Sequence, residues 1–182
     1  MAKNWSQIKG HIAGFSKAQL LGLVQDLYRA DGGNRDFLHT RFPEQSQGGD
    51  LRPYLAPYKE RIREALMPRG RHPRIDYCEA RKAISDYNKA RGELTQTFEL
   101  MLFYVKCGND LTGDIDEPFY NSMGSVFGAL VAKLLVQSNA ALLTEWFPKL
   151  EAEASRVREL GWGYGDELHE IIQDLRAKLA GA

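Results

Sequence analysis

Apolar residues recur along this chain every three or four positions, which is the spacing of one face of an α-helix. No segment alternates apolar and polar residues between hairpin turns, so the pattern gives no reason to expect a β-sheet. At roughly 150 residues per domain, the length favours one domain over residues 1–182. We therefore expect an all-α protein of about 8–10 helices, built either as an irregular helical bundle or as a short α-solenoid-like stack.

Capping signals mark where several of these helices should begin. Ser16 is followed three positions later by Gln19, and Asp76 in the same way by Glu79, which is the capping-box spacing. Asn34 is the expected N-cap of a short helix that ends before the next proline. Each of these signals predicts a helix start at the position that follows it.

Glycine and proline predict where helices stop or bend. Gly92 should end the helix that follows Asp76, although the apolar spacing continues in phase to residue 107 and leaves one bent helix as an alternative. Pro148 should kink the helix around it or divide it into two.

Two apolar stripes are prominent. The first, behind Ser16, predicts one side of an amphipathic helix: Leu20, Leu21, Val24, Leu27 and Tyr28. The second follows Pro118 and predicts the central helix, with its buried side at Phe119, Met123, Phe127, Leu130 and Leu134. Small residues recur every four positions in that helix, which predicts close approach of a neighbouring helix backbone at Gly124, Gly128 and Ala132.

Charge is balanced overall but not along the chain. Residues 1–91 hold 17 Lys and Arg against 10 Asp and Glu, a net charge of +7, whereas residues 92–182 hold 7 against 14, a net charge of −7. This basic N-terminal half and acidic C-terminal half could bind an anionic partner or pair with copies of the same chain. The alternative is that the two halves attract each other within one fold.

Cysteine usage and hydropathy indicate a cytoplasmic protein without a membrane contact. Cys78 and Cys107 lack metal-ligand spacing and form no disulfide framework. The longest apolar run, Val126–Val136, is interrupted by Lys133 and is shorter than the ~20 residues of a membrane span. The first residues lack the apolar region of a signal peptide.

An acidic group precedes the predicted central helix. Asp114, Asp116 and Glu117 offer three carboxylates that could bind Mg²⁺ or Ca²⁺, with Tyr120 one turn further on as a fourth candidate binding residue. The calcium-hand pattern does not fit this segment, because its glycine and its distal glutamate are missing. The alternative is that these carboxylates cap the helix, and we expect no bound metal or cofactor.

A second group of candidate binding residues surrounds the three glycines at 161, 163 and 165. Trp162 and Tyr164 lie between the glycines, and Asp166 is the expected cap of the last helix. His169 follows Asp166 by three positions, so the two could form an Asp-His pair for proton transfer, but no nucleophile lies nearby in sequence. The alternative is a tight loop whose aromatic rings pack on the core.

A third group is a basic loop between Pro68 and residue 74. Its candidate phosphate-contacting residues are Arg69, Arg71, His72 and Arg74, with Arg52, Lys59 and Arg63 on the preceding helix. The alternative is a solvated surface, which the isoelectric point near 6.9 favours. The four histidines lack zinc-ligand spacing.

The segments Ala80–Ala90, Glu99–Lys106, Gly113–Met123 and Gly161–Leu168 resemble those of an uncharacterised family of small bacterial proteins, most specifically in the motifs GDIDEPFY and GWGYGDEL. The resemblance implies an all-helical cytoplasmic protein and supplies no activity. Members of that family often have a histidine where this chain has Gly165.

Three functional hypotheses follow. The first is a non-enzymatic helical scaffold or adaptor that binds a protein partner or associates with itself. The second is a metal-dependent enzyme or small-ligand-binding domain centred on Asp114, Asp116 and Glu117. The third is a nucleic-acid-associated protein that uses the basic loop at 68–74.

Overall fold

The computed structural model describes residues 4–43, 52–69, 74–111 and 115–180. Within these ranges the secondary structure is entirely helical, with nine α-helices and no strand, which confirms the all-α prediction. Contacts group the chain into two compact units, unit 1 (residues 1–48) and unit 2 (residues 49–182). The expectation of one domain therefore stays a prediction, and we describe each unit separately.

Unit 1 contains α1 (Trp5–Ile12), α2 (Lys17–Ala30) and α3 (Gly32–Arg41). The predicted capping box of α2 is confirmed: the Gln19 amide donates to Ser16 Oγ at 3.3 Å, and the Ser16 amide donates to Gln19 Oε1 at 2.8 Å. Asn34 was the wrong N-cap for α3. Asp31 caps it instead, because its carboxylate accepts the Asn34 amide at 3.2 Å and α3 follows α2 without a longer loop.

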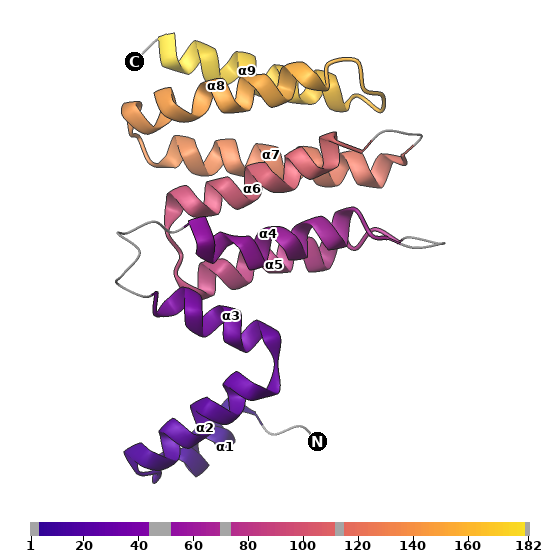
Figure 1. Cartoon of the computed structure of the whole chain (residues 1–182). Helices are drawn as coiled ribbons and strands as arrows, with labels where there is room; N and C mark the ends of the chain where they lie inside the picture. The colour runs from indigo at the N-terminus through magenta and orange to yellow at the C-terminus, as the bar shows by residue number, and fades with distance from the viewer. Residues whose placement is uncertain (1–3, 44–51, 70–73, 112–114, 181–182) are drawn as a thin grey trace. The chain divides into compact units, whose positions relative to one another are not determined.

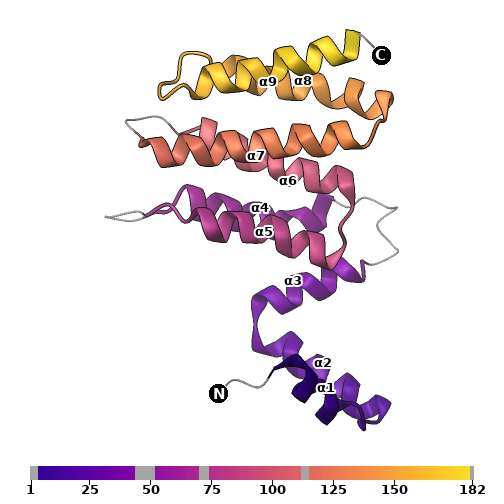
Figure 2. The ribbon, with the colours of Figure 1, turned by 180° about the vertical axis from the view of Figure 1, so that it is seen from behind.

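Unit 2 is a stack of three helical hairpins (Figures 1 and 2). The hairpins are α4 (Arg52–Leu66) with α5 (Tyr77–Ala90), α6 (Leu94–Asn109) with α7 (Glu117–Val136), and α8 (Ala140–Arg156) with α9 (Tyr164–Ala180). Along the stack, α4 packs on α6, α6 on α8, and α7 on α9. Of the two predicted arrangements, unit 2 has the α-solenoid-like one.

The hairpin topology puts three helix starts side by side. In both views, α4, α6 and α8 finish at the same end of unit 2 at which α5, α7 and α9 begin (Figures 1 and 2). We call this the loop end. It collects the described parts of three segments that are far apart in the sequence, residues 67–76, 110–116 and 157–163.

The core of unit 2 lies between its helices and follows the predicted faces. The five residues expected to form the buried side of α7 are all at most 1% exposed: Phe119, Met123, Phe127, Leu130 and Leu134. Between α6 and α8 the rings of Phe98 and Trp146 meet edge to face with centroids 5.5 Å apart. Among the described helices, α7 has the length and hydropathy to cross a membrane, and 56% of that stretch is buried inside the protein, as in a core helix.

The sequence signals at Gly92 and Pro148 have different outcomes. Gly92 has a φ of +70° and follows the end of α5, so α5 and α6 are two helices and not one bent helix. Of the two outcomes expected at Pro148, the division into two helices is wrong, because α8 continues through the proline, and the kink stays a prediction. Trp146 and Leu150, on either side of Pro148, are both buried in the core and hold the two halves of α8 in one packed helix.

The small-residue stripe of α7 does not face a neighbouring backbone as expected. A Cβ on Gly124 would lie 2.4 Å from the Glu167 carboxylate of α9, and one on Gly128 would lie 3.8 Å from the Ile171 side chain. Ala132 is exposed. The tightest glycine contact between α6 and α7 is at Gly108, where a Cβ would lie 2.2 Å from the sulfur of Met123.

Candidate functional site

The loop end brings described members of all three groups of candidate residues into one region of unit 2. The indole N–H of Trp162, between α8 and α9, donates to the Ile115 carbonyl, before α7, at 3.2 Å. Residues before α5 and before α7 in turn line one cleft. The sequence pattern predicts each group but not their proximity, which follows from the hairpin stacking.

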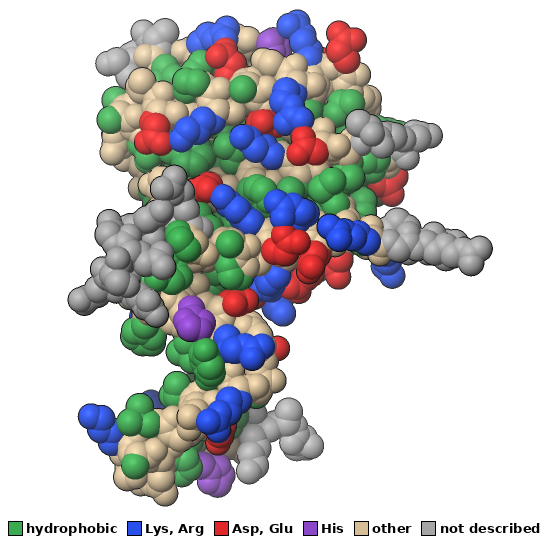
Figure 3. Space-filling model, in the orientation of Figure 1, with side chains coloured by type: hydrophobic (Ala, Val, Ile, Leu, Met, Phe, Trp, Pro, Cys, Tyr) green, Lys and Arg blue, Asp and Glu red, His purple; other side chains and the backbone are tan. Residues whose placement is uncertain are grey.

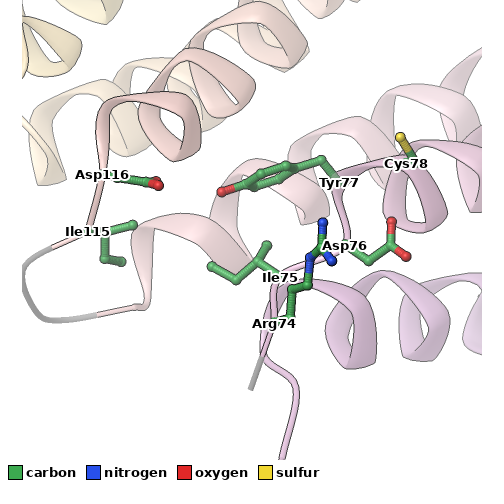
Figure 4. A pocket seen from close by; sticks show the side chains of 7 residues that line it. All are labelled: Arg74, Ile75, Asp76, Tyr77, Cys78, Ile115 and Asp116. Carbon is green, nitrogen blue, oxygen red and sulfur yellow. The ribbon is translucent and has the colours of Figure 1, made fainter. Parts of the chain in front are cut away.

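The cleft lies between the start of α5 and the start of α7 (Figure 4). Its lining residues are Arg74, Ile75, Asp76, Tyr77, Cys78, Ile115 and Asp116. In Figure 4 the Tyr77 hydroxyl points toward the Asp116 carboxylate, while the Cys78 sulfur points away. Burial raises the pKa of Tyr77, and the negative charge of Asp116 raises it further, so the phenol stays protonated at neutral pH.

The two carboxylates of this cleft cap helices. Asp116 Oδ1 accepts the Phe119 amide at 3.3 Å at the start of α7, and Asp76 Oδ1 accepts the Glu79 amide at 2.9 Å at the start of α5. Asp114 lies outside the described residues. Within the described part of the chain, no three His, Cys, Asp or Glu side chains are placed to hold a metal ion. The contacts of Asp116 therefore match the capping interpretation of the acidic group.

Tyr120 and Tyr164 are core residues. Tyr120 is 7% exposed and its ring lies 5.4 Å from the ring of Tyr164, which is 2% exposed. The Tyr164 hydroxyl donates to Asn109 Oδ1 at 2.8 Å, and burial raises the pKa of Tyr164 far above its ordinary value. These aromatic side chains fasten α9 to α6 and α7.

A buried polar network continues from Tyr164. The Asn109 side-chain amide donates to Glu153 Oε2 at 3.1 Å, and Glu153, although only 4% exposed, pairs with Arg156 at 3.0 Å and with Lys106 at 3.8 Å. Sequence reasoning missed both Asn109 and Glu153. One signal was present: Glu153 follows the buried Trp146 by seven positions, so it lies at an apolar phase of α8.

Asp166 and His169 do not form the Asp-His pair that was one of the two alternatives for this segment. The last helix begins at Tyr164, three residues before the start that a cap at Asp166 predicts, so Asp166 lies exposed in its first turn and is not its cap. The His169 ring is 3.3 Å from the Gln173 side-chain amide. A Cβ on Gly165 would lie 2.4 Å from the Val157 carbonyl oxygen, so close backbone packing requires glycine at this position.

The basic loop is described only in part, because Arg71 and His72 lie outside the described residues. Arg69 and Arg74 are exposed. On α4, Lys59 pairs with Glu99 and Arg63 with Glu60, and both cations lie over the Phe103 ring, 5.6 and 5.3 Å from its centroid. In Figure 3, positive and negative side chains are interspersed over this face of unit 2. A continuous positive groove is not visible there.

Nine of the eleven exposed large apolar side chains among the described residues lie in unit 1, and their exposure was not predicted. The stripe of α2 that should be buried is solvent-exposed: Leu20 is 41%, Leu21 61%, Val24 43% and Leu27 49% exposed. We call these four residues the α2 stripe. Five more large apolar side chains of unit 1 are 38–71% exposed: Trp5, Ile8, Phe15, Phe37 and Phe42. Green side chains are accordingly visible on unit 1 in Figure 3.

A shallow groove lies beside the α2 stripe, between α2 and α3. Its lining residues are Ala18, Leu21, Gly22, Val24, Gln25, Tyr28 and Leu38. The two helices are joined by a hydrogen bond of 3.0 Å between the Tyr28 hydroxyl and His39 Nε2, and by one of 2.8 Å from the Asn34 side-chain amide Nδ2 to the Leu27 carbonyl. The groove is uncharged and has two small residues, Ala18 and Gly22, in its lining.

No protein family, curated protein or solved structure matched the chain in comparisons with known proteins. The resemblance of the GDIDEPFY and GWGYGDEL motifs therefore stays an expectation.

Proposed function

We propose that this protein is a non-enzymatic helical scaffold that binds protein, with the apolar surface of unit 1 as its contact surface and unit 2 as its packed body. The observation that carries the proposal is the exposure of nine large apolar side chains in residues 4–43, where none is buried. Exposed apolar patches of this kind mark protein contacts in soluble proteins.

The local structure of unit 1 favours a built surface over an unfolded segment. All three helices have a side-chain N-cap, and α1 and α2 each have both hydrogen bonds of a capping box. Capping fixes where these helices begin, and the three- and four-residue spacing then places the α2 stripe on one side of α2. A helix with an uncovered apolar side gains most of its stability when a partner covers it.

The loop end offers less support for catalysis or phosphate binding. Its carboxylates at Asp76 and Asp116 accept helix amides, and Tyr164 and Tyr120 are packed in the core. The cations of α4 that flank the basic loop are paired with Glu99 and Glu60. These side chains stabilise the packing of unit 2, as expected if unit 2 is the structural body of a scaffold.

Site-specific photo-crosslinking in the full chain tests the proposal. A benzophenone amino acid replaces Val24, which is 43% exposed on unit 1, and in a matched control it replaces Val136, which is 79% exposed on unit 2. We expect irradiation in the producing cells to give a discrete protein adduct from position 24 and none from position 136. Equal adducts from both positions, or none from position 24, would contradict the proposal.

A further inference from the structure

We propose that the protein covering the α2 stripe is a second copy of this chain, paired antiparallel through α2 about a twofold axis at Val24. This inference rests on the proposed function, since it names the partner of the same surface. Two features support it: the area of the apolar surface and the charges at the two ends of α2.

The exposed area matches what a stable dimer needs. Taking ~200 Å² for a fully exposed large apolar side chain, the nine side chains of unit 1 expose on the order of 900 Å². A stable protein complex buries about 800 Å² on each partner, and homodimer interfaces are the more apolar ones. The α2 stripe supplies on the order of 400 Å² of this area, so a dimer of this size also covers exposed apolar side chains of α1 and α3.

The charges of α2 favour an antiparallel arrangement. Lys17 begins the helix and Asp31 follows its last residue, each seven positions from Val24. A twofold axis at Val24 places Lys17 of one copy opposite Asp31 of the other, whereas a parallel pair would place like charges opposite each other. The same axis places Leu20 opposite Tyr28 and Leu21 opposite Leu27, so each residue of the α2 stripe meets an apolar residue.

Sedimentation velocity of the full chain tests the association. We expect a species of twice the 20.6 kDa chain mass, and we expect Leu21→Glu to weaken the dimer by roughly 100-fold or more, because it places an unpaired charge in the interface. Circular dichroism checks that the variant keeps its helices. Val136→Glu, on the exposed surface of α7, is the matched control and should leave the dimer intact.

Cysteine cross-linking tests the arrangement in a Cys78→Ser background, which removes the exposed native thiol. Val24→Cys lies on the proposed axis, so two copies should form a disulfide on mild oxidation. Leu20→Cys should not, since its two copies would be separated by about 12 Å along the helix, beyond the reach of a disulfide. Cross-linking at both positions would mean a parallel pair and would overturn the proposal.

A monomer at ~100 μM, well above the Kd of a stable dimer, would also overturn it. In that case the dye anilinonaphthalene sulfonate separates this inference from the proposed function. Dye binding that Leu21→Glu abolishes would show an open surface that serves a different protein, so only the second copy would be excluded. A monomer that binds no dye would show that the chain covers this surface itself, which would overturn both proposals.

Discussion

Units 1 and 2 are both built from amphipathic helices with well-defined caps, yet only unit 2 buries its apolar faces. In unit 2, α4 to α9 pack as stacked hairpins around Leu100, Phe127, Leu150 and other residues that are fully buried. In unit 1, the equivalent positions of α2 are 41–61% exposed. A well-capped amphipathic helix of this chain therefore does not always bury its apolar face.

In this chain local signals decide where a helix forms, while the number of neighbouring helices decides whether its apolar face is covered. Each hairpin of unit 2 packs on another hairpin, and α6 contacts both helices of the first hairpin as well as α7 and α8. In unit 1, α2 has substantial contacts with α3 among the described helices of that unit. One side of α2 is thus exposed.

The largest expected effect comes from truncating a side chain in each unit. Phe127→Ala should lower the free energy of unfolding of unit 2 by about 3–5 kcal/mol, because it opens a cavity in the core. Leu27→Ala, on the exposed side of α2, should change it by less than about 0.5 kcal/mol. Urea unfolding followed by circular dichroism measures both, and equal losses would show that the two units share one core.

Two glycine substitutions test the close helix–helix packing of unit 2, which unit 1 lacks. Gly108→Ala should destabilise unit 2 by about 1–3 kcal/mol, since its Cβ would lie 2.2 Å from the sulfur of the fully buried Met123. Gly128→Ala is the matched control. Its Cβ meets only Ile171 at 3.8 Å, so the higher helix propensity of alanine should stabilise the protein by up to about 1 kcal/mol. A stabilising Gly108→Ala would contradict the close α6–α7 contact.

Helix caps should act differently in the two units. Asp116→Ala removes the cap of α7 and should lower the thermal unfolding midpoint of unit 2, at a cost of about 0.5–2 kcal/mol. Ser16→Ala removes the cap of α2 and should reduce helicity without moving that midpoint. Calorimetric titration with Mg²⁺ should give the same result for the parent and for Asp116→Ala. Micromolar binding that only the parent shows would instead support the metal-site hypothesis.

The smallest effects concern single hydroxyl groups in the core of unit 2. Among the described residues the buried Tyr87 hydroxyl has no hydrogen-bond partner, and burial raises the pKa of Tyr87 to about 12. Tyr87→Phe should therefore be neutral or stabilising by up to about 1 kcal/mol. Tyr164→Phe, which loses the hydrogen bond to Asn109, should cost about 0.5–1.5 kcal/mol. Thermal unfolding distinguishes them, and a cost at Tyr87 would indicate an unseen partner.

Much of the fold could be predicted from the sequence because its determinants are local. The caps at Ser16 and Asp76, the helix end at Gly92 and the buried face of α7 all depend on residues within a few positions of one another. The sequence could not decide between one kinked helix and two helices at Pro148, because the packing on both sides of the proline that keeps α8 continuous is not a local signal.

The candidate site was predictable as separate segments and not as an arrangement. The Trp162 hydrogen bond to Ile115 and the buried Asn109–Glu153 contact join residues 44–47 positions apart, which only the stacking of hairpins brings together. The exposure of the α2 stripe was hidden for the opposite reason. An apolar stripe that packs on its own chain and one that stays exposed in the single chain have the same three- and four-residue spacing of apolar positions.

Hydrogen exchange of the full chain at two protein concentrations tests most directly the central claim that unit 1 completes its packing on a partner. We predict that backbone amides of α6 and α7 exchange slowly at every concentration, because their opening requires unfolding of unit 2. Amides of α2 should exchange quickly at ~1 μM and slow markedly at ~100 μM, as a second copy covers the α2 stripe. Slow exchange in α2 that does not depend on concentration would contradict the account, since it would mean that this helix is already covered within a single chain.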